Sequence, residues 1–334
     1  MNFPIRRCLR FFNRLLLSAA FVLSAGWGAF ALFYQFPFPA LKALAVAGWL
    51  GIAGLTVFVA WRNGVLRGSL LYMVALALLL GWWLSLKPSN TREWPDDVAE
   101  TTTAVRHGDV VTFSHVRNFD WRSETDYTPR WERRQYDLGQ LRSVDMLLSY
   151  WTGPAIAHTL VSFGFSDGRY LVFSVEIRKE RHEAFSEIGG FFKQFETSLI
   201  VADERDIVRV RTNIRGEDVY LYRISMPQEA MRELFLAYAG EANQLAAKPR
   251  FYHTVTANCT TVVYEMVRKI IPGLPMDYRL LLSGYLPEYL YGIGGLDKRF
   301  SLEALRQSGR VTDRAKAADR DPDFSRLIRG NMHE

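Results

Sequence analysis

Three apolar stretches in the first quarter of the chain constrain its fold more than any other feature. Each is free of charged residues and, at about 20 residues, is long enough to cross the hydrocarbon layer of a bilayer as a helix. They cover residues 15–34, 43–61 and 68–85. Only the short sequence RNGVLR separates the second stretch from the third, which predicts a helical hairpin. We therefore expect a membrane anchor over residues 1–88.

The basic residues beside these stretches predict the orientation of the anchor. Four arginines precede the first stretch and two more lie in the hairpin turn, whereas the first loop offers only Lys42. Because Lys and Arg accumulate on the cytoplasmic side, we expect the N-terminus in the cytoplasm and the rest of the chain in the periplasm, anchored in a bacterial inner membrane. A basic start before an apolar stretch is also typical of a signal peptide, but this stretch is longer than usual and two more follow.

The rest of the sequence predicts a linker, a folded domain and a tail. Residues 89–104 are polar and proline-containing, and residues 310–334 are charged and expected to be loosely ordered. Between them, over residues 105–309, a series of strand patterns precedes a series of helix patterns, which indicates an α+β domain with an antiparallel sheet. The expected strands lie at 110–113, 143–150, 158–165, 170–177, 199–202, 207–212 and 219–224.

The charge balance gives no reason to expect a nucleic-acid partner. The chain has 41 Lys and Arg against 35 Asp and Glu, and much of the excess lies beside the apolar stretches rather than in basic runs. No paired cysteines and no His-x-x-x-His spacing occur, so we expect neither a metal site nor a cofactor. Membrane lipid is the expected partner.

Cys259 is the candidate nucleophile. It directly precedes an apolar run with helical spacing, in the segment NCTTVVYEMVRKII at residues 258–271. A cysteine at a helix N-terminus lies at the positive end of the helix dipole, which stabilises its thiolate. The other cysteine, Cys8, lies in the basic N-terminus, so a disulfide between the two is not expected. A buried, unreactive thiol is the alternative reading of Cys259.

A thiolate nucleophile needs a base, and His158 is the best placed of the six histidines. It opens the strand pattern HTLVSFGF. If Ser166, Asp167 and Gly168 form a three-residue loop, the hairpin register places Glu176 opposite His158, where it would orient the imidazole. A slip of one residue would replace Glu176, and Asp206 is the reserve candidate for this role.

The segment before Cys259 offers groups for an oxyanion hole. The backbone N–H of Cys259 is one donor, and Asn258 or His253 could supply a side-chain donor. Tyr252 lies in the same stretch, where it could contact substrate or only pack.

The order of His158 on a strand before an NC dipeptide that opens a helix resembles the circularly permuted papain-like fold of NlpC-type and lecithin:retinol acyltransferase-like enzymes. More closely, four segments resemble the bacterial family of Lnb N-terminal periplasmic domains, over roughly residues 116–282. Two features differ: in the family the membrane part follows the domain, and the lecithin:retinol relatives carry a second His where this chain has Tyr170. The four segments are VRNFDWRSETDYTPRW, AHTLVSFGFSDGRYLVFSVEIRKE, VADERDIVRVRTN and FYHTVTANCTT.

The resemblance implies a permuted papain-like domain in which Cys259 carries an acyl thioester and His158 is the base. The expected function is a cysteine-dependent acyltransferase that takes an acyl chain from a phospholipid and passes it to a lipoprotein. A peptidase or amidase acting on cell-wall peptides would use the same residues, and a non-catalytic envelope module is a third possibility. The segment LLLSGYLPEYLYG at 280–292 either packs as core or lines an acyl channel.

Overall fold

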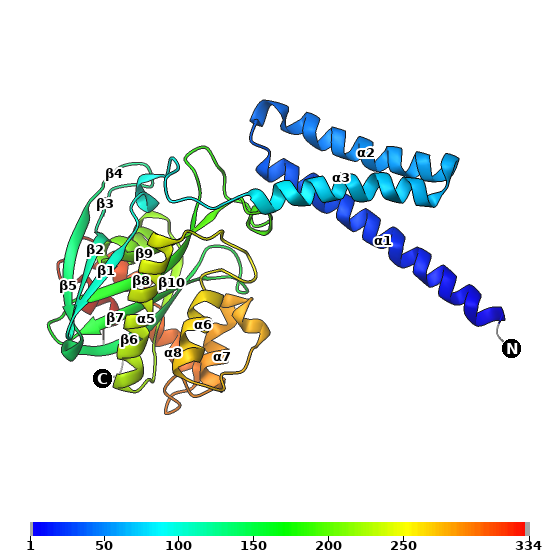
Figure 1. Ribbon diagram of the computed structural model, residues 1–334. Helices are drawn as coiled ribbons and strands as arrows, with labels where there is room; N and C mark the ends of the chain where they lie inside the picture. The colour runs from blue at the N-terminus through cyan, green and yellow to red at the C-terminus, as the bar shows by residue number, and fades with distance from the viewer. Residues whose placement is uncertain (1–2, 331–334) are drawn as a thin grey trace. The chain divides into compact units, whose positions relative to one another are not determined.

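The computed structural model in Figure 1 describes residues 3–330, and of residues 3–11 and 14 it describes the backbone alone. The chain forms two compact units. The helical unit comprises Met1–Pro88 and Ser186–Gln194, and the α+β domain comprises Ser89–Phe185 and Phe195–Glu334. The side chain of Cys8 lies outside the described residues.

Within the described residues, three helices of the helical unit are long and apolar enough to cross a membrane, as the sequence predicts. Small residues let them approach closely, because a side chain at Gly28 would lie 2.5 Å from the Trp49 ring. Trp49 donates a hydrogen bond from Nε1 to the carbonyl of Ala25 at 2.8 Å, so its one polar atom is satisfied within the bundle. The helices are α1 (Phe3–Gln35), α2 (Lys42–Asn63) and α3 (Val65–Ser85).

The segment 186–194 packs on the helical unit through aromatic and polar contacts. The ring of Phe192 stacks on that of Tyr34 with centroids 5.6 Å apart, and Lys193 Nζ donates to the carbonyl of Trp83 at 2.8 Å. This segment is therefore part of the same unit as α1 and α3, although it belongs to a connection between two strands of the α+β domain.

An eight-stranded sheet is the centre of the described α+β domain, with strand order β1-β2-β9-β8-β7-β6-β10 and β5 paired to β2. Its pairs are antiparallel except for β2 with β9. A small ribbon, β3 with β4, lies apart. The strands are β1 (Thr103–His107), β2 (Val110–Arg117), β3 (Asp120–Trp121), β4 (Tyr127–Thr128), β5 (Trp131–Asp137), β6 (Leu141–Tyr150), β7 (His158–Phe165), β8 (Tyr170–Arg178), β9 (Glu196–Ala202) and β10 (Asp218–Arg223).

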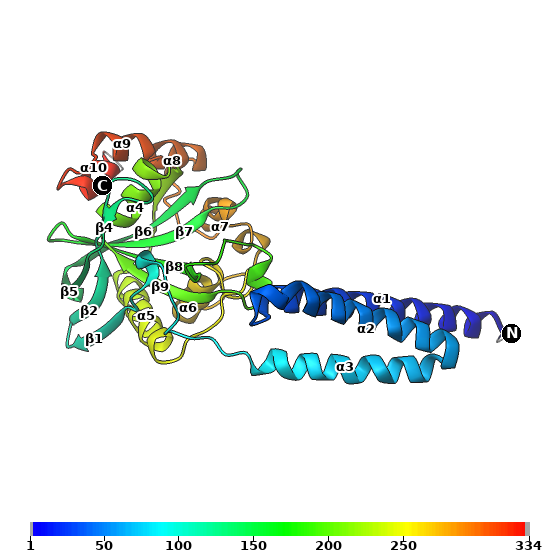
Figure 2. The same ribbon diagram turned by 90° about the horizontal axis from the view of Figure 1, so that it is seen from above.

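Helices cover both faces of this sheet, which Figure 2 shows between them. The mixed α and β architecture agrees with the predicted fold class, whereas kinship with the papain-like fold stays a prediction. The helices of this domain are α4 (Glu204–Arg209), which continues into a π-helical turn (Val210–Ile214), α5 (Gln228–Ala247), α6 (Thr261–Ile270), α7 (Leu286–Gly292), α8 (Leu302–Gly309), α9 (Thr312–Ala317) and α10 (Phe324–Arg329). Short 3-10 turns lie at Pro39–Leu41, Asp96–Val98, Leu138–Gln140, Gly189–Phe191, Tyr278–Leu280 and Ser283–Tyr285.

The face covered by α5 and α6 is apolar and rich in aromatic residues. Phe235 of α5 is fully buried, and its ring lies 5.1 to 5.6 Å from those of Phe113, Phe163 and Phe173, in edge-to-face contacts. The alternation of side chains along the strands supplies these residues from every second position. We call this layer the apolar face.

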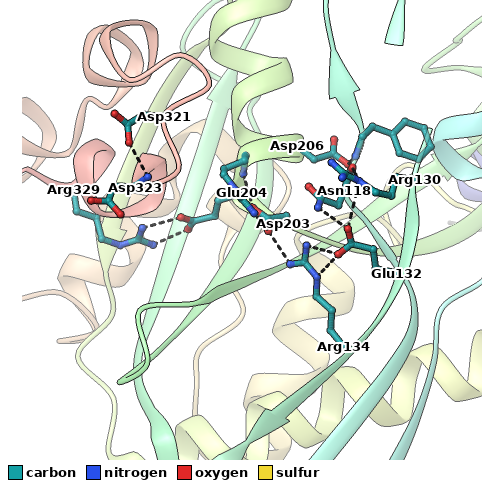
Figure 3. A network of polar contacts seen from close by, with 12 residues as sticks. Asn118, Arg130, Glu132, Arg134, Asp203, Glu204, Asp206, Asp321, Asp323 and Arg329 are labelled. Atoms are coloured by element: carbon teal, nitrogen blue, oxygen red, sulfur yellow. Dashed lines mark hydrogen bonds and ion pairs between the residues drawn. The ribbon is translucent and has the colours of Figure 1, made fainter. Parts of the chain in front are cut away.

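The face covered by α4, α9 and α10 combines apolar contacts with buried charges. Arg329 of α10 makes a bidentate contact with Glu204 at 2.7 and 2.8 Å (Figure 3). It also donates a hydrogen bond to Asp145 at 2.9 Å. Asp206 accepts hydrogen bonds from Arg117 at 2.9 and 3.1 Å. Because unpaired buried charges are costly, these contacts determine how the helices sit. We call this layer the polar face.

One predicted strand is wrong. Residues 207–212 belong to α4 and the π-helical turn, where the carboxylate of Asp203 accepts a backbone hydrogen bond and starts the helix. The alternation of apolar residues with Arg209 and Arg211 imitated a strand with one solvated face. Both arginines are in fact buried and ion-paired, so the alternation did not mark exposure.

The ends of the domain are also more ordered than expected. Residues 310–330 are not a loose tail, because Val311, Phe324 and Ile328 are fully buried in the polar face. Residues 89–104 are not a free linker, because Trp94 and Val98 are buried against the same layer. In the sequence these apolar residues are surrounded by charged residues, which suggested exposed segments. Many of those charged side chains are paired within the fold, so their presence did not indicate exposure.

Candidate active site

Cys259 lies at the N-terminal end of α6, where Asn258 organises the first turn. The side-chain Oδ1 of Asn258 accepts hydrogen bonds from the backbone N–H groups of Thr260 at 2.9 Å and Thr261 at 2.8 Å. This cap holds the polar lead-in in place and aligns the helix dipole with the thiol. Cys259 is a free cysteine and only partly buried.

His158 lies at the start of β7, close enough to the thiol of Cys259 for each group to shift the pKa of the other. Its Nε2 lies 2.6 Å from Ser174 Oγ and 3.2 Å from Glu176 Oε1. Ser174 Oγ in turn donates to Glu176 Oε1 at 2.7 Å. Because Nε2 is engaged by these two residues, Nδ1 is the ring nitrogen left for the thiol.

The hairpin register that placed Glu176 opposite His158 is confirmed. β7 pairs with β8 from Leu160 with Ser174 to Gly164 with Tyr170, and Phe165 donates its N–H to the carbonyl of Arg169 at 3.0 Å. Ser174 and Glu176 are two positions apart on one strand, so both side chains are on the side of the sheet that carries His158.

Arg211 holds Glu176 from the far side. Its Nη2 donates to Glu176 Oε1 at 2.8 Å, and its Nη1 lies 3.5 Å from Glu217. Ser149 donates a hydrogen bond to the same carboxylate of Glu217. The polar chain behind the thiol thus runs from His158 through Glu176 and Arg211 to Glu217.

These contacts shift the titration of the three central groups. Burial raises the pKa of the Cys259 thiol, but the hydrogen bond and charge of His158 and the N–H of Thr159 outweigh it, so the pKa is below its ordinary value. Burial lowers the pKa of His158, but the Glu176 carboxylate raises it to about 9. Burial also raises the pKa of Glu176, and His158 with Arg211 holds it well below its usual range. The arrangement therefore favours the thiolate form of Cys259 and the imidazolium form of His158 relative to the free side chains.

An apolar pocket begins beside the thiol. The cavity measures about 140 Å³, and its lining includes Thr159 and Thr260, the residues that directly follow His158 and Cys259. Residues of β6, β7, α5, α6 and α7 line it, together with the segments 224–226, 274–280 and 293–295. Among the described residues, no charged side chain lines this pocket. Ligand pockets are typically lined by apolar side chains with few polar groups, as this one is.

Comparison with known families decides the assignment of this domain. Residues 127–284 match the model of the Lnb N-terminal periplasmic domain, and this segment contains Cys259, His158 and all their partners described above. The chain carries an Lnb N-terminal periplasmic domain. No curated protein and no solved structure matches the chain. Together with the three apolar helices, the Lnb domain makes this a membrane protein with a periplasmic domain.

The residues expected to form an oxyanion hole in the Lnb domain have other partners. Asn258 uses Oδ1 for the helix cap, and its Nδ2 donates to the carbonyl of Thr254 at 2.7 Å. His253 Nδ1 accepts backbone hydrogen bonds at 3.2 and 3.3 Å within its own turn. Tyr252 donates its backbone N–H to the carbonyl of Phe195 at 2.8 Å. The backbone N–H of Cys259 donates to no protein acceptor in the described part of the chain, which leaves it as the donor for an oxyanion.

Sequence reasoning missed three members of the Lnb site. Ser174 shares the strand face of Glu176, so the same register count that found Glu176 also points to it. Arg211 was hidden by the incorrect strand over residues 207–212. Thr159 acts through its backbone, which no sequence pattern reveals. The reserve candidate, Asp206, pairs with Arg117 and not with His158.

The loop after α6 that contains Ser283 and Gly284 also positions the site. Ser283 Oγ accepts a hydrogen bond from the N–H of Ala157 at 3.0 Å and donates to its carbonyl at 2.6 Å. Gly284 packs so closely here that a side chain would lie 2.0 Å from the carbonyl oxygen of Pro154, so this position requires glycine. These contacts fix the residue before His158 against the wall of the pocket.

Proposed function

We propose that this protein is a membrane-anchored periplasmic thiol acyltransferase that carries its acyl group on Cys259. The observation that carries the proposal is the junction between the thiol site and the uncharged apolar pocket. A thiolate with a lowered pKa suits attack on an ester carbonyl, and an apolar pocket beside it suits the acyl chain of that ester.

The first half-reaction loads the enzyme. The thiolate of Cys259 attacks the carbonyl carbon of a phospholipid ester, and the backbone N–H of Cys259 stabilises the oxyanion. The ester C–O bond breaks as the C–S bond forms, and the imidazolium of His158 gives its proton to the departing alkoxide. The product is an acyl thioester on Cys259 and a lysophospholipid.

The second half-reaction passes the acyl group to an amine. The amine nitrogen attacks the thioester carbonyl, His158 accepts the proton that the nitrogen loses, and the C–S bond breaks to regenerate the thiolate and imidazolium. The amino terminus of a lipoprotein is the proposed acceptor. A membrane anchor supports this choice because it keeps the site near lipid substrates and raises their effective concentration.

We also infer that the anchor lies in the inner membrane with its N-terminus in the cytoplasm. Arginines flank the N-terminal side of the first span and the turn between α2 and α3, which matches the rule for cytoplasmic loops. Fusions of alkaline phosphatase after residue 63 and after residue 88 test this inference. Only the second fusion should be active, since the reporter needs the periplasm.

Intact-mass measurement tests the acyl-enzyme. The full-length protein in detergent is incubated with phosphatidylethanolamine, and an added mass equal to one acyl chain is expected. Hydroxylamine should remove it, as it does from thioesters. The adduct should persist in Cys8→Ala, which is the matched control, and disappear in Cys259→Ala.

Other outcomes would redirect the assignment. No adduct in the wild type, together with rapid alkylation of Cys259, would contradict acyl transfer and favour hydrolysis of cell-wall peptides by the same site. No adduct and an ordinary alkylation rate would leave a non-catalytic envelope domain.

A further inference from the structure

The apolar pocket follows one face of α6 along its length. Thr260, Val263, Val267 and Ile271 all line it, with the helical spacing that places residues on one side of a helix. The rise of about 1.5 Å per residue gives a path of about 16 Å from Thr260 to Ile271. Cys259 Sγ lies 3.9 Å from Thr260 Oγ1, so this path starts beside the sulfur.

Few polar groups line this path, and the two tyrosine hydroxyls among them have hydrogen-bond partners. Tyr264 and Tyr289 line the pocket, but their hydroxyls donate to the carbonyls of Leu274 and Pro275, each at 2.9 Å. Leu280 and Leu286 are buried and also line it. A linear apolar path of this kind suits an extended hydrocarbon chain better than a peptide, whose amide groups would be left without partners.

The length of the path translates into a chain length. An extended chain advances about 1.2 Å per bond, as backbone dimensions show, so about 16 Å corresponds to about 13 bonds. We propose that α6 serves as a ruler for the acyl group, so that the site selects acyl chains of about 14 carbons over short ones. The proposal rests on the proposed thioester function and names the substrate class within it.

The position of Val267 makes the ruler testable at mid-length. It lies seven residues after Thr260, or about 10 Å along the helix, which an acyl chain reaches after about eight bonds, or about nine carbons. Burial of each further methylene strengthens binding about fourfold, or at least about 2.2-fold if only about 60% of that gain is realised, and the two acyl groups differ by six methylenes. A tetradecanoyl group should therefore be loaded at least 100-fold more efficiently than an octanoyl group.

The experiment compares acylation of Cys259 by p-nitrophenyl octanoate and p-nitrophenyl tetradecanoate in the full-length protein in detergent. Val267→Trp should slow loading of the tetradecanoyl group at least tenfold while octanoyl loading stays within threefold. The matched control is Lys269→Trp, which adds the same bulk at an exposed position of the same helix. Ratios between variants cancel the partition of the esters into micelles.

Ile271→Trp gives a second reading at the far end of the ruler. It should leave octanoyl and decanoyl loading unchanged and slow only tetradecanoyl loading. If Val267→Trp abolishes loading of every chain, this variant alone tests whether α6 measures chain length. Equal effects of Val267→Trp and Ile271→Trp on every chain length would overturn the ruler. Failure of the wild type to form a Cys259 adduct with any ester would instead overturn the proposed function, so the two failures are distinguishable.

Discussion

The two faces of the sheet in the α+β domain solve the problem of burial in different ways. The apolar face uses aromatic and aliphatic side chains, with Phe235 at its centre, and contains the pocket. The polar face buries Asp145, Glu204 and Asp206 at 0% exposure and pairs each with arginine. Apolar packing is tolerant of exchange, whereas a buried charge depends on one partner in one geometry. The apolar face should therefore tolerate exchange of side chains of similar volume, whereas the polar face should lose stability when one charged partner is removed.

Arg329→Met should have the largest effect. It leaves Asp145 and Glu204 without their shared partner, and loss of one member of a buried ion-paired group costs about 3–5 kcal/mol. A urea titration followed by circular dichroism measures the free energy of unfolding. The control is Arg326→Met in the same helix, where an exposed ion pair with Asp323 is worth less than about 1 kcal/mol. Equal costs for the two variants would refute the contrast between the faces.

Glu176→Gln should have the next largest effect, and on activity rather than stability. Glu176 raises the pKa of His158 to about 9, so wild-type loading is expected to fall as pH rises through 9 and the imidazolium loses its proton. Without the carboxylate, this fall should move at least one unit toward lower pH, because the ordinary His pKa is about 6.5. The rate of acyl-adduct formation from pH 6 to 10 measures the shift.

The control for this pH profile is Glu233→Gln, an exposed change on α5. Its profile should coincide with that of the wild type. An unchanged profile in Glu176→Gln would show that Glu176 does not act through His158.

Leu245→Met tests the tolerance of the apolar face. Leu245 is buried in its core, and a change that preserves volume costs less than about 1.5 kcal/mol. The same urea titration measures it, with Leu245→Asn as a partner variant that should cost more because it buries an amide without a partner. A cost for Leu245→Met as large as that of Arg329→Met would mean that both faces are equally brittle.

Ser174→Ala should have the smallest effect. The direct contact of 3.2 Å between His158 and Glu176 remains, so we expect loading at neutral pH to fall only about threefold, less than the loss of one net hydrogen bond implies. Ser166→Ala, in the exposed turn before β8, is the control. A loss as large as that of Glu176→Gln would assign the coupling to the hydroxyl instead of the direct contact.

The same contrast explains what the sequence could predict. The apolar face follows from regular spacing, and counting along the hairpin from Ser166 led to Glu176 because β-sheet register is an exact alternation. The polar face defeated this reasoning. Arg209 and Arg211 imitated the solvated side of a strand, and charged residues around Phe324 and Ile328 imitated a loose tail.

The pocket illustrates a further limit of sequence patterns. Segment 280–292 was expected either to pack as core or to line an acyl channel, and Leu280 and Leu286 belong to a buried cluster and also line the pocket. A hydrophobic sequence pattern predicts that a side chain is buried, but not whether it packs against protein or borders a pocket. Only the arrangement of α6 against this segment distinguishes the two.

The ion pair of Arg329 with Asp145 has a consequence for biogenesis. The two residues are 184 positions apart. At a synthesis rate of about 5–20 residues per second, β6 waits about 10 to 40 seconds before α10 exists. Until then Arg223 of β10 is the counter-charge for Asp145, and Arg329 completes the ion-paired group only once α10 has been made. The polar face is therefore completed after the apolar face, whose helices α5 and α6 lie earlier in the chain.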